Sequence, residues 1–202
     1  YKICKLKYEI NYTKFDLRIK NIGSKKLHIK NIFLNLIGKH NVLNATAAIA
    51  LCLNLGLSEN IIKKALKNFS GVQRRLTKVF KKNKVEFYDD YAHHPTEIKS
   101  VLEGVRMIAA KRKIISVFQP HRYTRVKVLK LEFASCFKNS DQVILCPMYA
   151  AGEPIDKKYH KNKFAQLISK FSKTQVILIE NENDLVKYFK KNLIKDEIVI
   201  GM

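Results

Sequence analysis

Apolar and polar residues alternate in the first part of this chain of 202 residues. Between residues 8 and 36 the alternation has a period of two, and a turn-forming stretch at 21–24 interrupts it. This pattern is typical of a β-hairpin or a β-meander with one buried face. The apolar positions that define it are Tyr8, Ile10, Tyr12, Phe15, Leu17, Ile19, Leu27 and Ile29.

The pattern then changes to one that predicts two helices. Residues 41–55 are rich in alanine and leucine and precede Gly56, a residue suited to the left-handed conformation that ends a helix. Ser58 is a good N-cap for a second helix at 59–69, whose apolar side chains fall on one face. The first part of the chain is therefore predicted to be an α+β region.

Strand and helix patterns alternate regularly from residue 84 onward. A charged, turn-prone stretch at 71–82 precedes them, and we place a domain boundary there. Alternation of this kind specifies an α/β fold, with a mostly parallel sheet and helices on both faces. The predicted strands are 84–89, 113–118, 142–147, 174–179 and 196–201, and the predicted helices are 95–110, 124–138, 160–171 and 182–193.

The formal net charge of +22 raises the possibility of a basic module that binds nucleic acid or another anionic partner without catalysis. Only seven of the 39 basic residues are arginines, and the lysines are spread through every segment. Because no basic stripe or nucleic-acid motif is present, we expect no specific nucleic-acid binding.

No apolar run approaches the roughly 20 residues that cross a bilayer, so we expect no membrane insertion and a cytoplasmic protein. The four cysteines have no CxxC spacing, which favours reduced thiols over a zinc site.

Two polar clusters follow predicted strands: DDYAHHP at 89–95 and QPHRYTR at 119–125. Side chains just beyond the carboxyl ends of parallel strands converge on one crevice, so we expect one shared site. Imidazole and guanidinium groups suit a phosphorylated or carboxylated substrate beside a nucleotide. The paired histidines also raise a metal hypothesis, but no HxxxH or HxH spacing supports it.

These clusters, together with two earlier motifs, resemble the Mur ligase family in order and spacing. The resemblance is strongest to members that join L-alanine to UDP-N-acetylmuramate, and the segment 147–153 agrees with this. A family member that recycles murein tripeptide has a similar DD-aromatic-AHHP segment, so it remains an alternative. The matching segments are GKHNVLNA at 38–45, GVQRR at 71–75, DDYAHHPTE at 89–97 and FQPHRYTR at 118–125.

The resemblance implies that residues 1–77 are the C-terminal part of a central ATP-binding domain and that 78–202 form a Rossmann-like C-terminal domain, truncated at its C-terminus. It also implies an ATP-dependent carboxylate–amine ligase of peptidoglycan precursor synthesis. In that reaction ATP phosphorylates the muramate carboxylate, and the amine of L-alanine attacks the acyl phosphate. Mg²⁺ is expected, with ligands mainly outside this chain.

Four residues receive ATP-site roles from the resemblance. Asn44 is expected at the adenine, where an amide can both donate and accept hydrogen bonds. Arg75 is expected at the phosphates, and Asp90 and His93 at the ribose. Ordinary capping or packing at the helix start is an alternative for Asn44 and the favoured interpretation for Asn41.

Four further residues are assigned to the reacting substrate. Tyr91 is expected near the reacting carboxylate and ATP. His121, Arg122 and Arg125 are expected to engage the muramate carboxylate and the substrate phosphates, with Tyr91 and His121 as the catalytic residues. These two arginines are three apart at a helix start, so they can share a face. The alternative for the 121–125 group is ordinary solvated charge.

Supporting roles are expected for Asp89, His94 and His40, and a surface position for Arg74. The chain lacks the GxxxxGK[ST] phosphate loop, since its one Gly-Lys pair is Gly38-Lys39. The chain begins without Met and stops at a strand end, so we interpret it as a fragment with little or no ligase activity alone.

Overall fold

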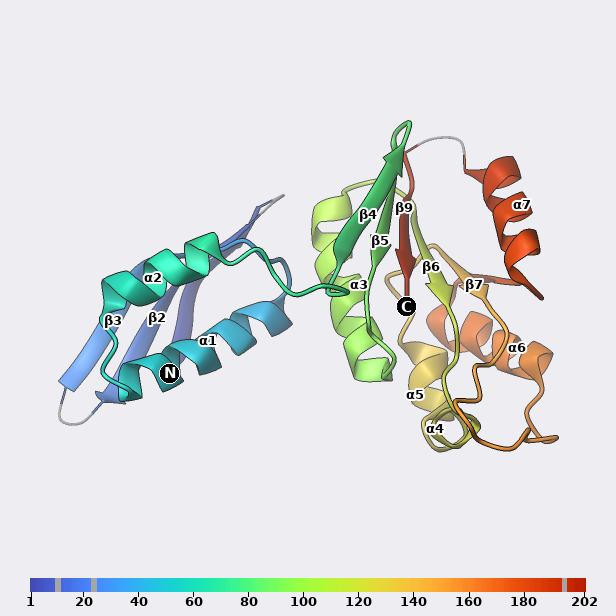
Figure 1. Cartoon of the computed structure of the whole chain (residues 1–202), viewed down its shortest axis with the longest axis horizontal. Helices are drawn as coiled ribbons and strands as arrows, with labels where there is room; N and C mark the ends of the chain where they lie inside the picture. Colours follow the sequence, from blue (N-terminus) through green and yellow to red (C-terminus); the bar gives the residue numbers. More distant parts are fainter. Residues whose placement is uncertain (10–11, 23–24, 194–195) are drawn as a thin grey trace. The chain divides into compact units, whose positions relative to one another are not determined.

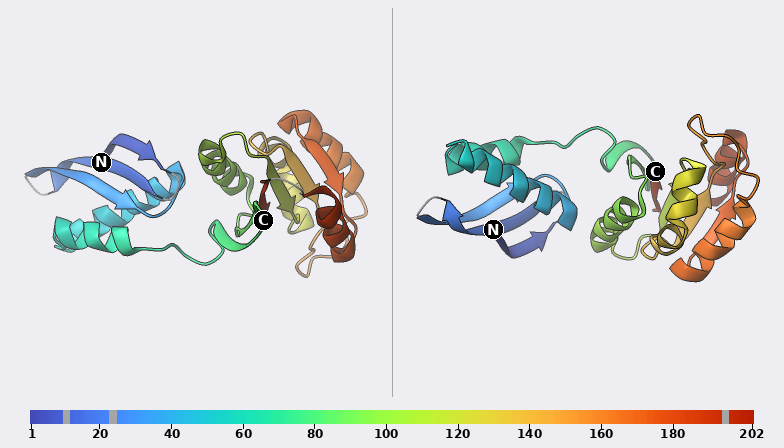
Figure 2. Two further views of the ribbon diagram at one scale, coloured as in Figure 1. Left: turned by 90° about the horizontal axis from the view of Figure 1, so that it is seen from above. Right: turned by 90° about the horizontal axis from the view of Figure 1, so that it is seen from below.

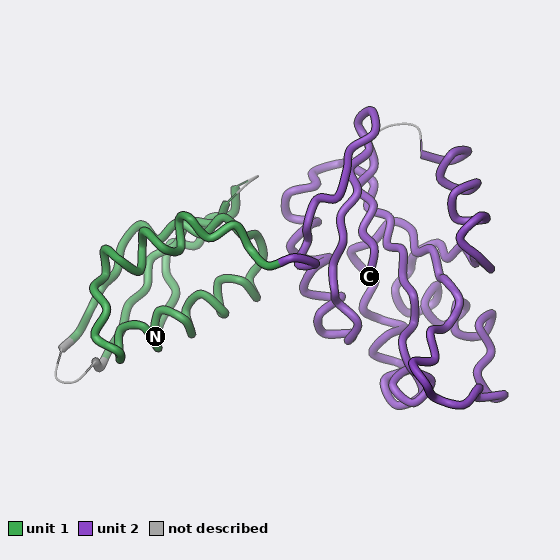
Figure 3. The backbone as a smooth tube through the Cα atoms, in the orientation of Figure 1, with its two compact units in different colours: residues 1–72 green, residues 73–202 purple. Residues whose placement is uncertain are grey.

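The computed structural model describes residues 1–9, 12–22, 25–193 and 196–202. These residues form two compact units, unit 1 at 1–72 and unit 2 at 73–202 (Figure 3). Ile10 and the central turn residues Gly23 and Ser24 lie outside the described residues.

Unit 1 is a three-stranded antiparallel sheet covered on one face by two helices (Figure 2). Strands β1 (Lys2–Tyr8), β2 (Thr13–Ile22) and β3 (Lys25–Leu34) pair in sequence order, as a meander does. Helices α1 (Lys39–Asn54) and α2 (Glu59–Asn68) complete the unit. The alternation in β2 buries Phe15, Leu17 and Ile19 against Val42, Ile49 and Ile62 of the helices. The predicted α+β arrangement is confirmed.

The predicted helix ends in unit 1 are also confirmed. Gly56 has a φ of 82°, and the N–H groups of Gly56 and Leu57 donate to the carbonyls of Leu53 and Cys52. This is the Schellman arrangement, which satisfies the last carbonyls of a helix. The Ser58 side chain caps the first turn of α2.

Unit 2 contains a six-stranded sheet in the order β4-β5-β9-β6-β7-β8. Figure 1 labels its strands from β4 to β7. All neighbours are parallel except β4 and β5, which are antiparallel. The last strand in sequence, β9, lies between β5 and β6. The strands are β4 (Thr77–Lys82), β5 (Val85–Asp89), β6 (Ile114–Phe118), β7 (Gln142–Leu145), β8 (Gln175–Leu178) and β9 (Ile198–Gly201).

Helices cover both faces of this sheet, as the α/β pattern predicts. Alternate strand residues point to opposite faces, so Ile114 and Phe118 enter one core while Ile115 enters the other. The first core includes residues of α3, α5 and α6, and the second includes residues of α7. The helices of unit 2 are α3 (Pro95–Ala109), α4 (Tyr123–Val128), α5 (Lys130–Ser135), α6 (Lys161–Ser172) and α7 (Glu182–Asn192).

Two predictions about unit 2 were wrong. The single helix expected at 124–138 is two short helices, α4 and α5, separated at Leu129. The end of the turn-prone stretch forms β4, an edge strand in which every residue is exposed. Its Phe80 ring stacks on Phe87 at 4.1 Å between centroids. Lysine-rich edge strands of this kind show no alternation of burial, so periodicity does not reveal them.

No helix among the described residues has the length and hydropathy of a membrane-spanning segment.

Candidate functional site

The loops that follow β5 and β6 bring the two polar clusters together at the carboxyl edge of the sheet of unit 2. The ring of His93, from the first loop, lies 6.3 Å from the ring of His121, from the second, measured between centroids. Tyr91 packs edge-on to His93 at 5.0 Å. This convergence confirms that the two clusters share one region, as parallel strand ends require. We call this region the rim, and it comprises Tyr91, His93, His121, Arg122 and Arg125.

The loop after β7 adds a residue to which sequence reasoning gave no role. The Tyr149 ring lies 5.2 Å from the His121 ring. The Tyr149 N–H donates to the Pro120 carbonyl at 2.8 Å, and the Arg122 N–H donates to the Tyr149 carbonyl at 2.9 Å. The backbone pairing of two loops therefore places Tyr149 on the rim, which no local sequence signal indicates.

Arg74 is exposed, as expected, but it contacts the rim. Its guanidinium lies 4.8 Å from the centre of the Tyr91 ring, a cation–π distance. Its Nε donates to Asp89 Oδ2 at 3.2 Å, and its carbonyl accepts from the Tyr91 N–H at 2.7 Å. Arg74, near the start of unit 2, therefore holds Tyr91 in place, and Asp89 at the end of β5 fixes the Arg74 side chain.

The hydrogen bonds of the two histidines place the ring proton of the neutral form on different nitrogens. Nδ1 of His93 lies 2.8 Å from the Tyr91 carbonyl, which only accepts, so this nitrogen carries a proton. Nδ1 of His121 lies 3.2 Å from Nη1 of Arg125, which only donates, so this nitrogen has none. In their neutral forms His93 therefore offers an acceptor at Nε2 and His121 offers a donor at Nε2.

Burial and nearby cations favour the neutral form of His121. Burial lowers the pKa of His121 below its ordinary value of 6.5, and the charges of Arg125 and Arg122 lower it further. The half-buried Arg125 lies in α4, and the exposed Arg122 immediately precedes that helix. The rim thus presents a neutral imidazole beside two permanent cations, an arrangement suited to an anionic ligand.

Asp90 does not lie on the exposed rim with the histidines, contrary to expectation. Its side chain is buried, and the residue is only 2% exposed. The carboxylate accepts hydrogen bonds from the N–H groups of Leu76 at 2.7 Å and Ala92 at 2.8 Å. A buried carboxylate needs such donors to offset its lost hydration. Asp90 therefore anchors the loop, and its contact with a ribose stays a prediction that this burial does not favour.

His94 caps α3, as its expected supporting role implies. Its Nδ1 accepts from the Thr96 N–H at 3.3 Å. Glu97 reciprocates by accepting from the N–H groups of His93 at 3.1 Å and His94 at 3.3 Å. Burial raises the pKa of Glu97, but these hydrogen bonds, the charge of His93 and the charge of the exposed Arg75 give a net lowering. The DDYAHHP loop is thus held at both ends.

The predicted residues of unit 1 lie at the start of α1. The side chain of Asn44 is exposed and has no hydrogen-bond partner among the described residues, so its amide is available to a ligand. Asn41 instead donates from Nδ2 to the Ile37 carbonyl at 2.8 Å, so its side chain packs at the helix start, while the N-cap is Gly38. The His40 ring packs against Gly38, whose φ is 102° and where an added Cβ would lie 2.8 Å from the ring.

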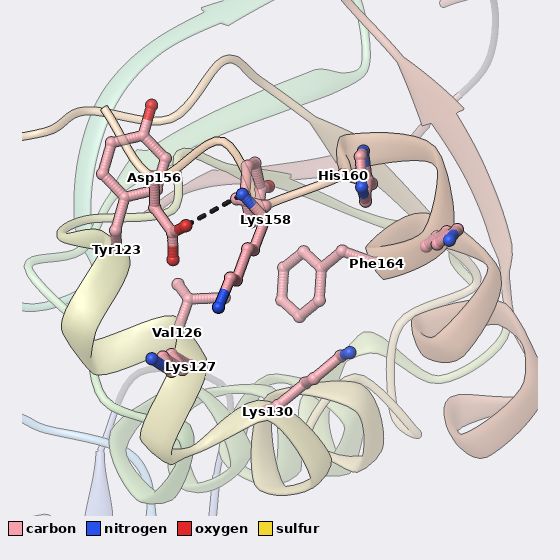
Figure 4. Close-up of a pocket in the computed structure, with 10 residues that line it drawn as sticks. Tyr123, Val126, Lys127, Lys130, Asp156, Lys158, His160 and Phe164 are labelled. Atoms are coloured by element: carbon pink, nitrogen blue, oxygen red, sulfur yellow. Dashed lines mark hydrogen bonds between the residues drawn. The ribbon is translucent and has the colours of Figure 1, made fainter.

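A separate cavity of about 120 Å³ lies between α4, α5 and the start of α6, and we call it the lysine cavity (Figure 4). Tyr123 and Phe164 form part of its wall, and the Asp156 carboxylate accepts from the Lys158 N–H at 2.8 Å. No rim histidine lines it. Four lysines also line it, none with a carboxylate partner among the described residues: Lys127, Lys130, Lys158 and Lys163.

A mostly parallel α/β sheet with polar loops gathered at its carboxyl edge defines the class of ligand-binding α/β domains. The sequence profile described as Mur ligase, glutamate ligase domain, matches residues 74–202, which is nearly all of unit 2. The chain belongs to the Mur ligase family.

Individual relatives agree with this membership. The UDP-N-acetylmuramate–L-alanine ligase of Pelagibacter ubique is 49% identical over 98% of this chain, which spans 42% of that relative. The crystal structure of the UDP-N-acetylmuramate–alanine ligase of Thermotoga maritima matches 98% of this chain and 41% of its own, with a TM-score of 0.72 and 25% identity. A murein peptide ligase of Psychrobacter arcticus shares the fold, with a TM-score of 0.64 and 22% identity over 94% of this chain and 38% of its own.

Proposed function

We propose that this chain is part of an ATP-dependent ligase that joins L-alanine to UDP-N-acetylmuramate in peptidoglycan precursor synthesis. The observation that carries the proposal is the convergence of His93, His121 and Arg125 at one sheet edge, in a chain 49% identical to a relative of that name. L-alanine and UDP-N-acetylmuramate each carry a carboxylate, and UDP-N-acetylmuramate also carries two phosphates. The cationic rim suits such groups.

Arg122 and Arg125 are the proposed anion-binding residues of the rim. A guanidinium can bind a carboxylate or phosphate through two parallel hydrogen bonds, which fixes both position and orientation. Acyl transfer through an acyl phosphate needs this positioning and charge neutralisation more than it needs a protein nucleophile. The two arginines therefore act by holding the substrate anion in place.

The two histidines and Tyr91 complete the proposed site. Neutral His121 donates from Nε2 to a substrate oxygen, because Arg125 occupies its Nδ1. The Nδ1 of His93 donates to the Tyr91 carbonyl, so its Nε2, where it carries no proton, accepts from a hydroxyl or an ammonium group. The exposed Tyr91 ring forms the surface between these groups and Arg74. The rim thus supplies a donor, an acceptor and cations within one area.

The proposed ATP contacts are Asn44 at the adenine and Arg75 at the phosphates. Both side chains are exposed, and a free amide and a cation fit those two parts of the nucleotide. ATP supplies the phosphoryl group that activates the carboxylate. We propose that the ligands of Mg²⁺ lie mainly outside this chain. The described residues include no group of three or more His, Cys, Asp or Glu side chains that could hold a metal ion.

The two units correspond, in this proposal, to two domains of a longer ligase. Residues 1–77 are the C-terminal part of the ATP-binding domain, and 78–202 belong to the C-terminal domain. The structural division falls slightly earlier, between Val72 and Gln73.

The proposal is tested by assaying the full-length enzyme that contains this chain. We expect ATP-dependent formation of UDP-N-acetylmuramoyl-L-alanine, with ADP and phosphate released in equal amounts. L-alanine and murein tripeptide should be compared as acceptors, and preference for the peptide would contradict the proposal. Salt-sensitive binding of random DNA without ligase activity would instead identify a noncatalytic basic module. The 202-residue chain alone is expected to show little or no turnover.

A further inference from the structure

The start of α4 is capped by a residue from another loop. Arg122, at the N-cap position, makes no side-chain capping hydrogen bond. Glu153, from the loop after β7, accepts from the Thr124 N–H at 3.0 Å through Oε2 and from the Thr124 hydroxyl through Oε1. A carboxylate in this position satisfies a first-turn donor and interacts favourably with the helix dipole. The hydrogen bonds from Thr124 lower the pKa of Glu153, so it is ionised at neutral pH.

The same loop holds the backbone that precedes α4 in an unfavourable conformation. Arg122 has a φ of 70° and a ψ of 126°, a combination that residues with a Cβ rarely adopt. The pairing of Tyr149 with Pro120 and Arg122 holds this conformation from one side. Ala151 and Gly152, with φ values of 50° and 85°, form the turn that brings Glu153 back to α4.

The loop after β7 therefore contacts the groups that hold His121, Arg122 and Arg125 in position. Tyr149 packs on the His121 ring and bonds the backbone of Arg122, and Glu153 caps the helix that carries Arg125. Without the cap, the first turn of α4 loses its acceptor and the strained Arg122 backbone can relax. A displacement of even about 1 Å in such a group costs a large factor in rate.

We propose that Glu153 is a positioning residue, which acts through Thr124 to hold His121, Arg122 and Arg125 in the geometry that binds the substrate anion. This inference rests on the proposed ligase function of the rim.

The kinetic test compares Glu153→Ala with Glu132→Ala in the full-length enzyme. Glu132 is an exposed residue of α5 whose side chain has no partner among the described residues, so it is a matched control. We expect Glu153→Ala to raise the KM for UDP-N-acetylmuramate or L-alanine about tenfold, without a change in the KM for ATP. Glu153→Gln retains an acceptor for the Thr124 N–H and should recover most of the loss.

A double variant shows whether Glu153 acts through Thr124. Thr124→Val removes one of the two contacts, and adding it to Glu153→Ala should have no further effect on KM. Additive effects, equal KM values for the Glu153 and Glu132 variants, or a lower melting temperature with unchanged KM values would each overturn the inference. If Glu153→Ala does not fold, Thr124→Val takes its place in the comparison with Glu132→Ala, because it removes the hydroxyl contact with Glu153.

An NMR measurement on the 202-residue chain separates this inference from the ligase proposal. Glu153→Ala should shift the ring resonances of His121 and the amide resonance of Arg122, whereas Glu132→Ala should not. Absence of these shifts would overturn the positioning role even in an active enzyme. An inactive wild-type enzyme with these shifts present would count against the ligase function alone.

Discussion

Arg125 donates a hydrogen bond from Nη1 to Nδ1 of His121 at 3.2 Å, and this contact determines which nitrogen of the imidazole faces a ligand. The donor leaves the proton of neutral His121 on Nε2. The residue that supplies the cation therefore also sets the tautomer of its neighbour.

The first prediction concerns the pKa of His121. Burial, Arg125 and Arg122 all lower this pKa below 6.5, so Arg125→Gln should raise it toward that value. An NMR pH titration of the imidazole measures the change. Lys127→Gln, which removes a charge from the same helix, should have a smaller effect. An unchanged or lower pKa in Arg125→Gln would contradict the assigned contact.

A second prediction distinguishes anchoring from ligand binding at Asp90. Asp90→Ala leaves the N–H groups of the half-buried Leu76 and the buried Ala92 without their acceptor, which should cost about 1–3 kcal/mol for the buried group and less for the other. Asp89→Ala removes only the exposed pair with Arg74 and should cost about 0–1 kcal/mol. Urea denaturation measures both. Equal stability of the two variants, with a raised KM for ATP only in Asp90→Ala, would instead support ribose binding.

The third prediction concerns acid stability. Burial raises the pKa of Glu86, but hydrogen bonds from Lys78 and Arg112 outweigh it and lower the pKa from 4.5 to about 2. The ionised carboxylate therefore stabilises the fold above about pH 4.5, and this stabilisation is lost as the pH falls toward 2. The free energy of unfolding of wild type should exceed that of Glu86→Gln at pH 7. This difference should shrink as the pH falls from about 4.5 to 2. A difference independent of pH would contradict the pairing.

A fourth prediction compares two glycines of unit 1 that both have positive φ. Alanine at Gly56 is strained by its φ of 82° but meets no atom within 4 Å. Alanine at Gly38 is strained by its φ of 102° and ψ of 143°, and it also approaches the His40 ring at 2.8 Å. Gly38→Ala should therefore lower the melting temperature more than Gly56→Ala. The reverse order would show that the His40 ring moves aside at little cost.

The central strands and the location of the rim were predictable from sequence for a simple physical reason. Strands β5, β6, β7 and β9 are short apolar runs, and parallel strands bring their following loops to one edge. His93 and His121 could thus be placed together without coordinates, although β9 separates their strands.

The remaining features depend on contacts between distant segments. Asp90 is buried because Leu76, 14 residues earlier, supplies a donor. Tyr149 and Glu153 reach the rim because one loop pairs with Pro120 and Arg122. β4 was missed because an exposed, lysine-rich edge strand has no periodic pattern. Local sequence patterns do not encode these pairings.

The central claim is that the rim binds the anion of an acid substrate, and the most direct test is the steady-state kinetics of Arg125→Lys in the full-length enzyme. Lysine keeps the charge but loses the two-pronged geometry and the contact with His121. We predict that kcat/KM for UDP-N-acetylmuramate or L-alanine falls about 10²-fold, while Lys127→Gln behaves as wild type. Unchanged kcat/KM for both substrates in Arg125→Lys would contradict the account.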